Sequence, residues 1–259
     1  MGGEDKEIKS KEGKYIYGII RHHGAIDFGP IGIGKRGDMV YGINYKNICA
    51  VVSNSPVIQY EAKRANLMAH ELVLEKVMEQ FSVLPGRFST VADTDGDAGI
   101  QKFLERDYDL LSKKLDSIEG KKELGLKVMA IEEVIFDHIL NKYPDIRNMK
   151  EKLIHLPADK TYYQRVKIGE QVEAALQKEK ESFKKQILDQ LTPLAERIQI
   201  NDNFGDRMIL NAAFLILKEK EPEFDEAVNK LDEQLGNILN FKYVGTLPPY
   251  NFVNMTINI

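Results

Sequence analysis

The order of apolar segments in the second half of the chain limits its fold more than any other feature of the sequence. Short apolar runs typical of strands alternate there with stripes at helical spacing. In chain order the segments are 123–131 (strand), 132–143 and 159–195 (helices), 197–202 and 207–217 (strands), 224–238 (helix) and 241–247 (strand). The order strand, helices, strand, strand, helix, strand predicts a modified ferredoxin-like α+β sandwich with an enlarged helical crossover.

The first half contains similar elements in another order, namely strands at 14–20, 38–43 and 48–53, a helix at 61–80, an extended run at 83–91 and a helix at 100–118. We therefore expect two α+β domains in the 259 residues, with the boundary near Glu119-Gly120. Residues 1–13 are interpreted as a disordered tail and 14–119 as an N-terminal domain, a related α+β sandwich. Residues 120–259 are the ferredoxin-like domain, including the long helix and a Pro-Pro-Tyr tail.

The helical stripes predict which side chains face a core. The stripe within 61–80 consists of Ala65, Met68, Ala69, Leu72, Val73 and Val77. Pro144 is expected to stop the helix that begins at 132. The stripe of the long helix runs from Tyr162 to Leu194, and we expect most of it to pack within its own domain. A second copy of the chain, or another partner, is the alternative cover.

Composition excludes several classes of protein. Apolar residues make up 43% and charged residues 29% of the chain, which is typical of a globular protein. The 36 basic and 40 acidic residues give a net charge of −4, so bulk charge predicts neither nucleic acid nor a membrane surface as partner. No run approaches the roughly 20 apolar residues of a membrane span, and residues 1–13 have no secretory h-region. We expect a cytoplasmic protein.

The run Gly29-Pro30-Ile31-Gly32-Ile33-Gly34-Lys35 fits the first seven positions of a phosphate-binding P-loop. Arg36 occupies the position of the Ser or Thr that binds Mg²⁺, and a strand-like run follows where that motif requires a helix. The pattern favours a mobile glycine-rich loop. A nucleotide- or small-molecule-binding enzyme or sensor that uses Gly29 to Lys35 remains the alternative function.

No catalytic, cofactor-binding or metal-binding residue is predicted. The segment that starts at Asp93 resembles the opening of an EF-hand, but Ala98 and Leu104 occupy its required Gly and Glu positions. None of the five histidines pairs at the i, i+4 spacing of a helical metal site. Cys49, the single cysteine, lies in an apolar strand pattern that is typical of a core residue.

Two segments are not explained by core packing alone. In Leu84-Pro85-Gly86-Arg87-Phe88-Ser89-Thr90-Val91, a Pro, a Gly and an Arg interrupt an apolar strand, which is typical of an edge or a bulge. In Gly245-Thr246-Leu247-Pro248-Pro249-Tyr250-Asn251-Phe252, two prolines and two aromatic residues predict a stiff, extended tail.

At these segments the chain resembles the gas vesicle protein F/L family. Leu84 to Val91 is similar to the LPxRFGTV signature of that family, with Gly86 where Val or Leu is common and Ser89 in place of the usual Gly. Leu247 to Phe252 is similar to its PPYxF tail. Tyr15-Ile16-Tyr17-Gly18-Ile19, Tyr162 to Gly169 and Asn211 to Leu215 also match, in the order of the family.

The resemblance implies a two-domain α+β accessory protein of gas vesicle assembly that binds the hydrophobic shell protein and other accessory proteins. It implies no catalysis, and it places the chain in the cytoplasm in association with gas vesicles. The residues it offers for partner binding are Leu84, Pro85, Arg87, Phe88, Pro248, Pro249, Tyr250 and Phe252. A homo-oligomeric scaffold formed through the long helix is a third possibility.

Overall fold

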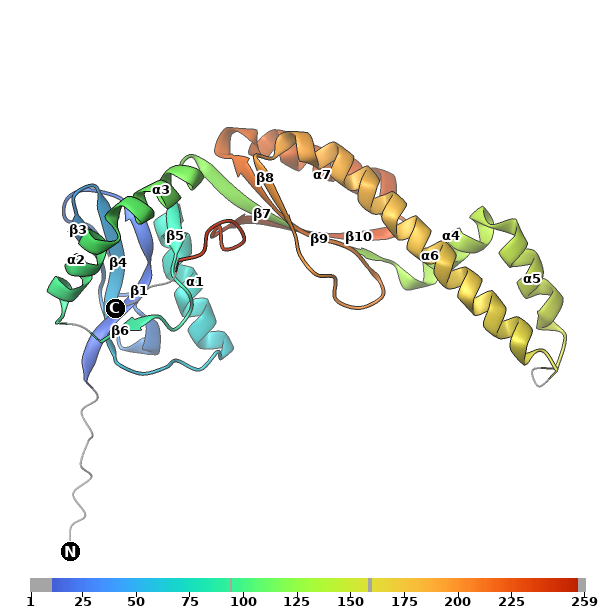
Figure 1. Cartoon of the computed structure of the whole chain (residues 1–259), viewed down its shortest axis with the longest axis horizontal. Helices are drawn as coiled ribbons and strands as arrows, with labels where there is room; N and C mark the ends of the chain where they lie inside the picture. Colours follow the sequence, from blue (N-terminus) through green and yellow to red (C-terminus); the bar gives the residue numbers. More distant parts are fainter. Residues whose placement is uncertain (1–10, 94, 158–159, 256–259) are drawn as a thin grey trace, which may run out of the picture. The chain divides into compact units, whose positions relative to one another are not determined.

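The computed structural model describes residues 11–93, 95–157 and 160–255 (Figure 1). It divides into two compact units, of which unit 1 comprises Met1–Glu123 with Thr246–Ile259 and unit 2 comprises Leu124–Gly245. Unit 2 is therefore inserted into the chain of unit 1. The predicted second domain includes the tail, whereas the structure packs residues 246–255 with unit 1, because their apolar side chains enter the cores of that unit.

Unit 1 is built on an antiparallel sheet whose strand order is β2-β3-β4-β1-β5, with β6 also paired to β1. Its strands are β1 (Glu12–Arg21), β2 (Asp27–Gly29), β3 (Val40–Tyr45), β4 (Ile48–Pro56), β5 (Val83–Pro85) and β6 (Val91–Ala92). The central strands β1 and β4 are almost continuously buried because both of their faces are covered. The runs predicted at 14–20, 38–43 and 48–53 are confirmed by β1, β3 and β4. The run predicted at 83–91 is wrong in its middle, because a turn at 86–90 separates β5 from β6, and β2 was not predicted. Of the predicted tail 1–13, residues 1–10 lie outside the described residues, and β1 already begins at Glu12.

Helices cover both faces of this sheet. Helix α1 (Arg64–Met78) packs on the face that carries Tyr15 and Tyr17. Helices α2 (Asp97–Arg106) and α3 (Tyr108–Ile118) pack on the face that carries Ile16 and Ile19. Tyr15, Ile16 and Tyr17 alternate between the two cores, as the alternation of side chains along a strand requires. A register shift of β1 against β4 between Ile16 and Gly18 then reverses this phase, so Ile19 faces the same core as Ile16.

Unit 2 contains a four-stranded sheet in the order β10-β7-β9-β8. Its elements are β7 (Lys121–Ala130), α4 (Glu132–Lys142), α5 (Pro144–Ile154), α6 (Tyr162–Leu191), η2 (Thr192–Leu194), β8 (Arg197–Ile200), β9 (Met208–Leu217), η3 (Lys218–Lys220), α7 (Glu221–Leu235) and β10 (Leu239–Leu247). Helices α4, α6 and α7 share one core with β7 and β9. Along β7, Leu126 and Val128 face this core, whereas Lys127 between them is exposed.

The long helix α6 extends past the sheet, and α4 and α5 flank its N-terminal half there (Figure 1). Its buried residues all lie between positions 175 and 191, namely Ala175, Leu176, Glu179, Phe183, Ile187 and Leu191. The prediction that most of the stripe packs within its own unit therefore applies to this part of the helix, while Tyr162 and Val166 are exposed. Pro144 ends α4 as predicted, but it also starts α5, which the sequence analysis did not predict.

Candidate functional site

The two segments singled out in the sequence meet in unit 1, around His70 of α1. Leu84 and Pro85 are buried in β5, Arg87 is exposed, and Phe88 is half-buried against the ring of His70. From the tail, Tyr250 places its hydroxyl 2.9 Å from Nε2 of His70. The structure thus joins residues 84–88 to a tail that lies about 160 positions later in the chain.

Hydrogen bonds around His70 (1% exposed) form a chain with one consistent direction. The backbone N–H of Ser89 donates to the Tyr15 hydroxyl over 2.8 Å, which leaves the Tyr15 O–H to donate to Nδ1 of His70 over 2.9 Å. Nε2–H of His70 then donates to the Tyr250 hydroxyl, and Tyr250 donates to the Gly86 carbonyl over 3.4 Å. This arrangement assigns the neutral Nε2–H tautomer to His70.

Burial fixes the protonation states in this cluster. It lowers the pKa of His70 to about 4 and raises the pKa of both Tyr15 and Tyr250 above its ordinary value. All three groups are therefore uncharged at neutral pH. A neutral imidazole between two protonated phenols holds β1, α1 and the tail together.

The rest of the tail is anchored in unit 1 as well. Pro248, Pro249 and Phe252 are buried, and Val253 and Met255 enter the core beneath α2 and α3. Asn251 donates to the carboxylate of Glu123 through its backbone N–H (3.1 Å) and its side-chain amide (2.5 Å). Burial raises the pKa of Glu123 although these hydrogen bonds oppose the shift. The residues of the tail signature thus make internal contacts in this structure.

The two departures from the family signature have local explanations. A Cβ on Gly86 would lie 2.7 Å from the carbonyl oxygen of Ile16, so the backbone of β1 leaves no room for a side chain at this position. Ser89 has a φ of 65°, in the left-handed region that favours glycine. Its Oγ accepts a hydrogen bond from the backbone N–H of Tyr60 over 2.7 Å, which compensates in part for the strained conformation.

The glycine-rich segment 29–35 does not have the structure of a P-loop. It leaves β2, turns through the short 3₁₀ helix η1 (Ile33–Lys35) and leads into β3. The hydroxyl of Tyr17 accepts the N–H of Ile33, and Arg36 pairs with Glu12 and Asp38 instead of facing a phosphate. The segment supplies no helix N-terminus for an anion, so the alternative function as a nucleotide-binding enzyme or sensor is not favoured.

Metal and nucleophile chemistry find no support in the described residues. Among residues 11–93, 95–157 and 160–255, no group of three or more His, Cys, Asp or Glu side chains is placed to hold a metal ion. Burial raises the pKa of the Cys49 thiol to about 12, so this side chain stays protonated. Within the same ranges, no helix is long and apolar enough to cross a membrane.

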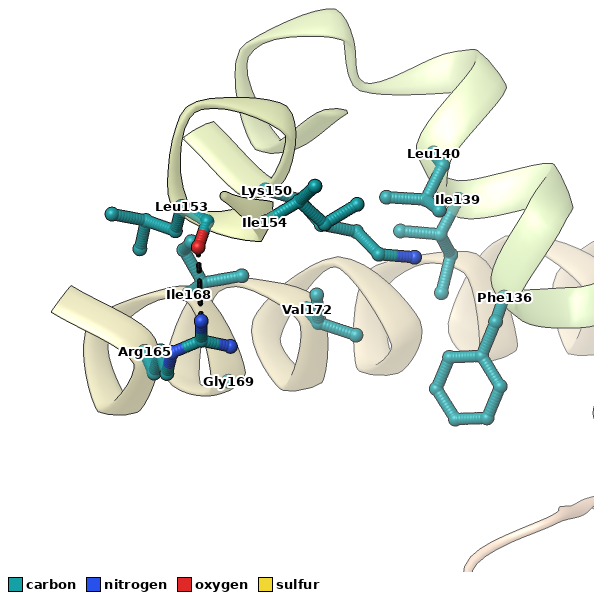
Figure 2. Close-up of a pocket in the computed structure, with 10 residues that line it drawn as sticks. All are labelled: Phe136, Ile139, Leu140, Lys150, Leu153, Ile154, Arg165, Ile168, Gly169 and Val172. Carbon is teal, nitrogen blue, oxygen red and sulfur yellow. Dashed lines mark hydrogen bonds between the residues drawn. The ribbon is translucent and has the colours of Figure 1, made fainter. Parts of the chain in front are cut away.

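A groove in unit 2 is a second candidate site. It lies between α4, α5 and the N-terminal half of α6 and has a volume of about 380 Å³ (Figure 2). Its lining is mostly apolar and consists of Phe136, Ile139, Leu140, Lys150, Leu153, Ile154, Arg165, Ile168, Gly169 and Val172. Arg165 closes one end by donating to the carbonyl oxygens of Leu153 (2.9 Å) and Leu156 (3.3 Å).

A buried carboxylate fixes the helices that form this groove. Glu179 of α6 (2% exposed) accepts hydrogen bonds from Lys142 (2.8 Å), Tyr143 (2.8 Å) and His138 (3.1 Å), which lie in α4 or directly after it. Burial opposes ionisation of Glu179, but the hydrogen bonds from these partners outweigh it and lower its pKa. These hydrogen bonds therefore hold α4 against α6 and fix the position of one wall of the groove.

Helix α1 carries a second apolar surface that nothing in the described chain covers. Met68 and Leu72 are 58% and 51% exposed, and Leu67 beside them is also exposed. The predicted stripe of α1 is thus wrong at Ala65, Met68 and Leu72, which are exposed, and confirmed at Val73 and Val77. The buried face is instead formed by His70, Val73, Leu74 and Val77, because His70 finds polar partners inside the unit.

Sequence reasoning missed His70 and the groove. A single histidine in a helix has no second residue at a spacing that would indicate a site. Its burial is explained only by its contacts with Tyr15 of β1 and Tyr250 of the tail. The groove depends on α5, and this helix was not predicted. The available signal was Pro144, because proline is common at the first position of a helix as well as after the end of one.

Comparisons with known proteins agree on one family. The family model described as "Gas vesicle synthesis protein GvpL/GvpF" matches residues 13–254. Gas vesicle protein F of Streptomyces sp. (strain CB03234) is 30% identical over 240 residues, which cover 92% of this chain and 98% of the relative. Gas vesicle protein F of Dolichospermum flosaquae is 28% identical over 244 residues, which cover 93% and 97%.

Solved structures show the same similarity. The crystal structure of the gas vesicle protein GvpF from Anabaena sp. PCC7120 matches with a TM-score of 0.79 at 25% identity and covers 95% of this chain and 99% of its own. That of GvpF from Microcystis aeruginosa matches with a TM-score of 0.72 at 26% identity and covers 94% and 99%. The resemblance drawn from the sequence motifs is confirmed, as is a fold of mixed helix and sheet.

Proposed function

Because this chain belongs to the GvpL/GvpF family of gas vesicle synthesis proteins, we propose that it is an accessory protein of gas vesicle assembly that binds the hydrophobic shell protein. The match of the family model to residues 13–254 carries the proposal. Its setting would be the cytoplasm, in association with gas vesicles, and its partners would include other accessory proteins. Self-association through exposed apolar side chains is compatible with this role.

The outer face of α1 is the surface that we propose for the shell protein. Met68 and Leu72 lie four positions apart on one side of the helix, with Leu67 next to them, and all three are exposed. Adjacent large apolar side chains on a surface are typical of a site where another apolar surface is covered. The motif residues Arg87 and Phe88 lie in the same unit and are proposed as further contacts, since Arg87 is exposed and Phe88 is half-buried.

We also propose that unit 2 is a modified ferredoxin-like sandwich. Its elements follow the order strand, helices, strand, strand, helix, strand. The strand order β10-β7-β9-β8 supports this view, since the first and third strands of the unit lie in the centre of the sheet. The insertion of α4 and α5 before α6 accounts for the enlarged crossover.

Capture of the purified shell protein by the full chain tests the function. We expect the wild-type chain to retain the shell protein and the double variant Met68→Gln/Leu72→Gln to lose most of this binding, since it keeps the helix but removes the apolar surface. Phe204→Gln, which changes an exposed aromatic residue on the β8–β9 turn of unit 2, is the matched control. Absence of binding by the wild-type chain, together with normal vesicles in a deletion strain, would refute the proposal.

A further inference from the structure

We propose that the groove between α4, α5 and α6 is a docking site for an acidic amphipathic helix of a partner protein. This surface differs from the face of α1 proposed above for the shell protein, and the inference does not depend on that contact. Three independent features of the groove support it, namely its open apolar walls, a glycine in its floor and an unpaired positive charge inside it.

The walls of the groove expose apolar surface that a monomer would be expected to bury. Ile154 at the end of α5 is 59% exposed and Phe136 of α4 is 43% exposed. Apolar area removed from water contributes about 25 cal/mol per Å², so an apolar partner surface that fits between these walls gains affinity. Because the groove is open rather than enclosed, it suits a segment of a macromolecule better than a small molecule, which pockets usually surround.

Gly169 keeps the floor of the groove low. It lies inside the 30-residue helix α6, where glycine costs roughly 0.5–1 kcal/mol relative to alanine. A Cβ built at this position meets no atom within 4 Å, so no packing contact in the described chain requires the glycine. A glycine on a helix surface lets another backbone approach closely, which is what a helix crossing α6 at this point needs.

Lys150 determines the charge of the proposed partner. Figure 2 shows its side chain lying along the apolar groove with Nζ directed toward Ile139, and it has no hydrogen-bond or ion-pair partner among the described residues. The residues that line the groove include two cations, Lys150 and Arg165, and no Asp or Glu. A carboxylate beside the apolar face of the partner helix would pair with Lys150, and like charge would be repelled.

A helix is the occupant that fits this geometry. Grooves formed by helices commonly accept the apolar face of an amphipathic helix through anchors at i, i+3 or i+4, and i+7. The residues of α6 that line the groove run from Arg165 to Val172 and span about 10 Å at 1.5 Å per residue, which matches the distance between anchors at i and i+7. A membrane surface would also favour basic and apolar side chains, but it cannot enter a concave site.

Selection of peptides on the full chain tests the inference. A displayed library of amphipathic helices, each about 14 residues long with a fixed apolar face and random flanking positions, is selected on the wild-type chain and counter-selected on Gly169→Leu. Leucine fills the groove and has a better helix propensity than glycine, so this variant keeps its fold. We expect the enriched peptides to carry Asp or Glu beside the apolar face.

A charge exchange then tests Lys150 by fluorescence anisotropy. Lys150→Glu is expected to weaken binding of the best acidic peptide about tenfold or more, and a Lys-for-Glu exchange in the peptide is expected to restore it. Lys152→Glu, an equal change at an exposed position of α5 outside the groove, is expected to leave the affinity unchanged.

Three results would overturn the inference. The first is that no peptide is enriched on the wild-type chain over the Gly169→Leu variant. The second is that Lys150→Glu and Lys152→Glu change the peptide affinity equally. The third is that the chain binds phosphatidylserine vesicles in a way that depends on Gly169 and Lys150, but binds no peptide. Each is distinguishable from failure of the proposed function, because capture of the shell protein is measured separately and with variants of α1.

Discussion

Acidification from pH 7 to pH 5 is expected to weaken unit 1 through the buried side chain of His70. Its pKa is about 4 in the folded chain, against an ordinary value of 6.5. Between these values the unfolded chain binds more protons than the folded one, so the free energy of unfolding falls as the pH is lowered. A difference of 2.5 units corresponds to a loss of about 3 kcal/mol below pH 4, and at pH 5 to about 2 kcal/mol.

The geometry explains why the cluster opposes protonation. A proton on Nδ1 would have to be donated to the hydroxyl of Tyr15, which already accepts the N–H of Ser89. The Tyr15 O–H would then lose its acceptor in a buried site, where an unsatisfied polar group costs about 1–3 kcal/mol. Protonation leaves the Nε2–H that donates to Tyr250 in place, so the loss falls on the contact between His70 of α1 and Tyr15 of β1.

Hydrogen exchange followed by mass spectrometry, on peptides that cover β1 and β4, measures the opening of unit 1 separately from unit 2. Between pH 7 and pH 5, the opening free energy of the wild-type chain should fall by about 2 kcal/mol more than that of His70→Gln. His155→Gln changes an exposed histidine outside unit 1 and should behave as the wild type. Equal pH dependence in the wild type and His70→Gln would refute the reasoning.

Three further outcomes are expected. Removal of residues 246–259 should lower the opening free energy of β1 by on the order of 5 kcal/mol, because buried apolar side chains of the tail leave the core, while exchange in β9 stays unchanged. Gly86→Val should lower the free energy of unfolding of unit 1 by about 1–3 kcal/mol in urea titrations, since its Cβ would meet the backbone of β1. Glu179→Gln should lower the free energy of unfolding of unit 2 by about 1–3 kcal/mol at pH 7. The difference from the wild type should be smaller at acidic pH, because the wild-type chain itself loses the contribution of this carboxylate as the pH falls through its lowered pKa.

Local patterns in the sequence were sufficient for most secondary structure. The apolar run at 14–20 predicted β1, and the side chains of Leu176, Phe183 and Ile187 are buried on α6 as their spacing indicated. These predictions succeeded because each depends on a periodicity of 2 or 3.6 within a single element. Pro144 shows where such reasoning stops, since its ring is equally compatible with the end of α4 and the start of α5.

The candidate sites depend on contacts between distant residues, which periodicity does not encode. Apolar spacing alone placed Met68 and Leu72 in the core, but burial of His70 turns that side of α1 outward. The polar residue is accepted inside only because Tyr15 and Tyr250 satisfy both of its ring nitrogens. Tyr250 lies 180 positions away, so no local pattern predicts that the tail belongs to unit 1.

The insertion of unit 2 within unit 1 sets an order for synthesis and folding. The strands and helices of unit 1 are translated first, but the tail that completes its core follows the roughly 120 residues of unit 2. At about 5–20 residues per second, the ribosome needs on the order of 10 s to synthesise this insert. During this interval the nascent chain exposes the vacant positions for Phe252, Val253 and Met255. Unit 2 can therefore complete its core before unit 1 does, although the synthesis of unit 1 begins first.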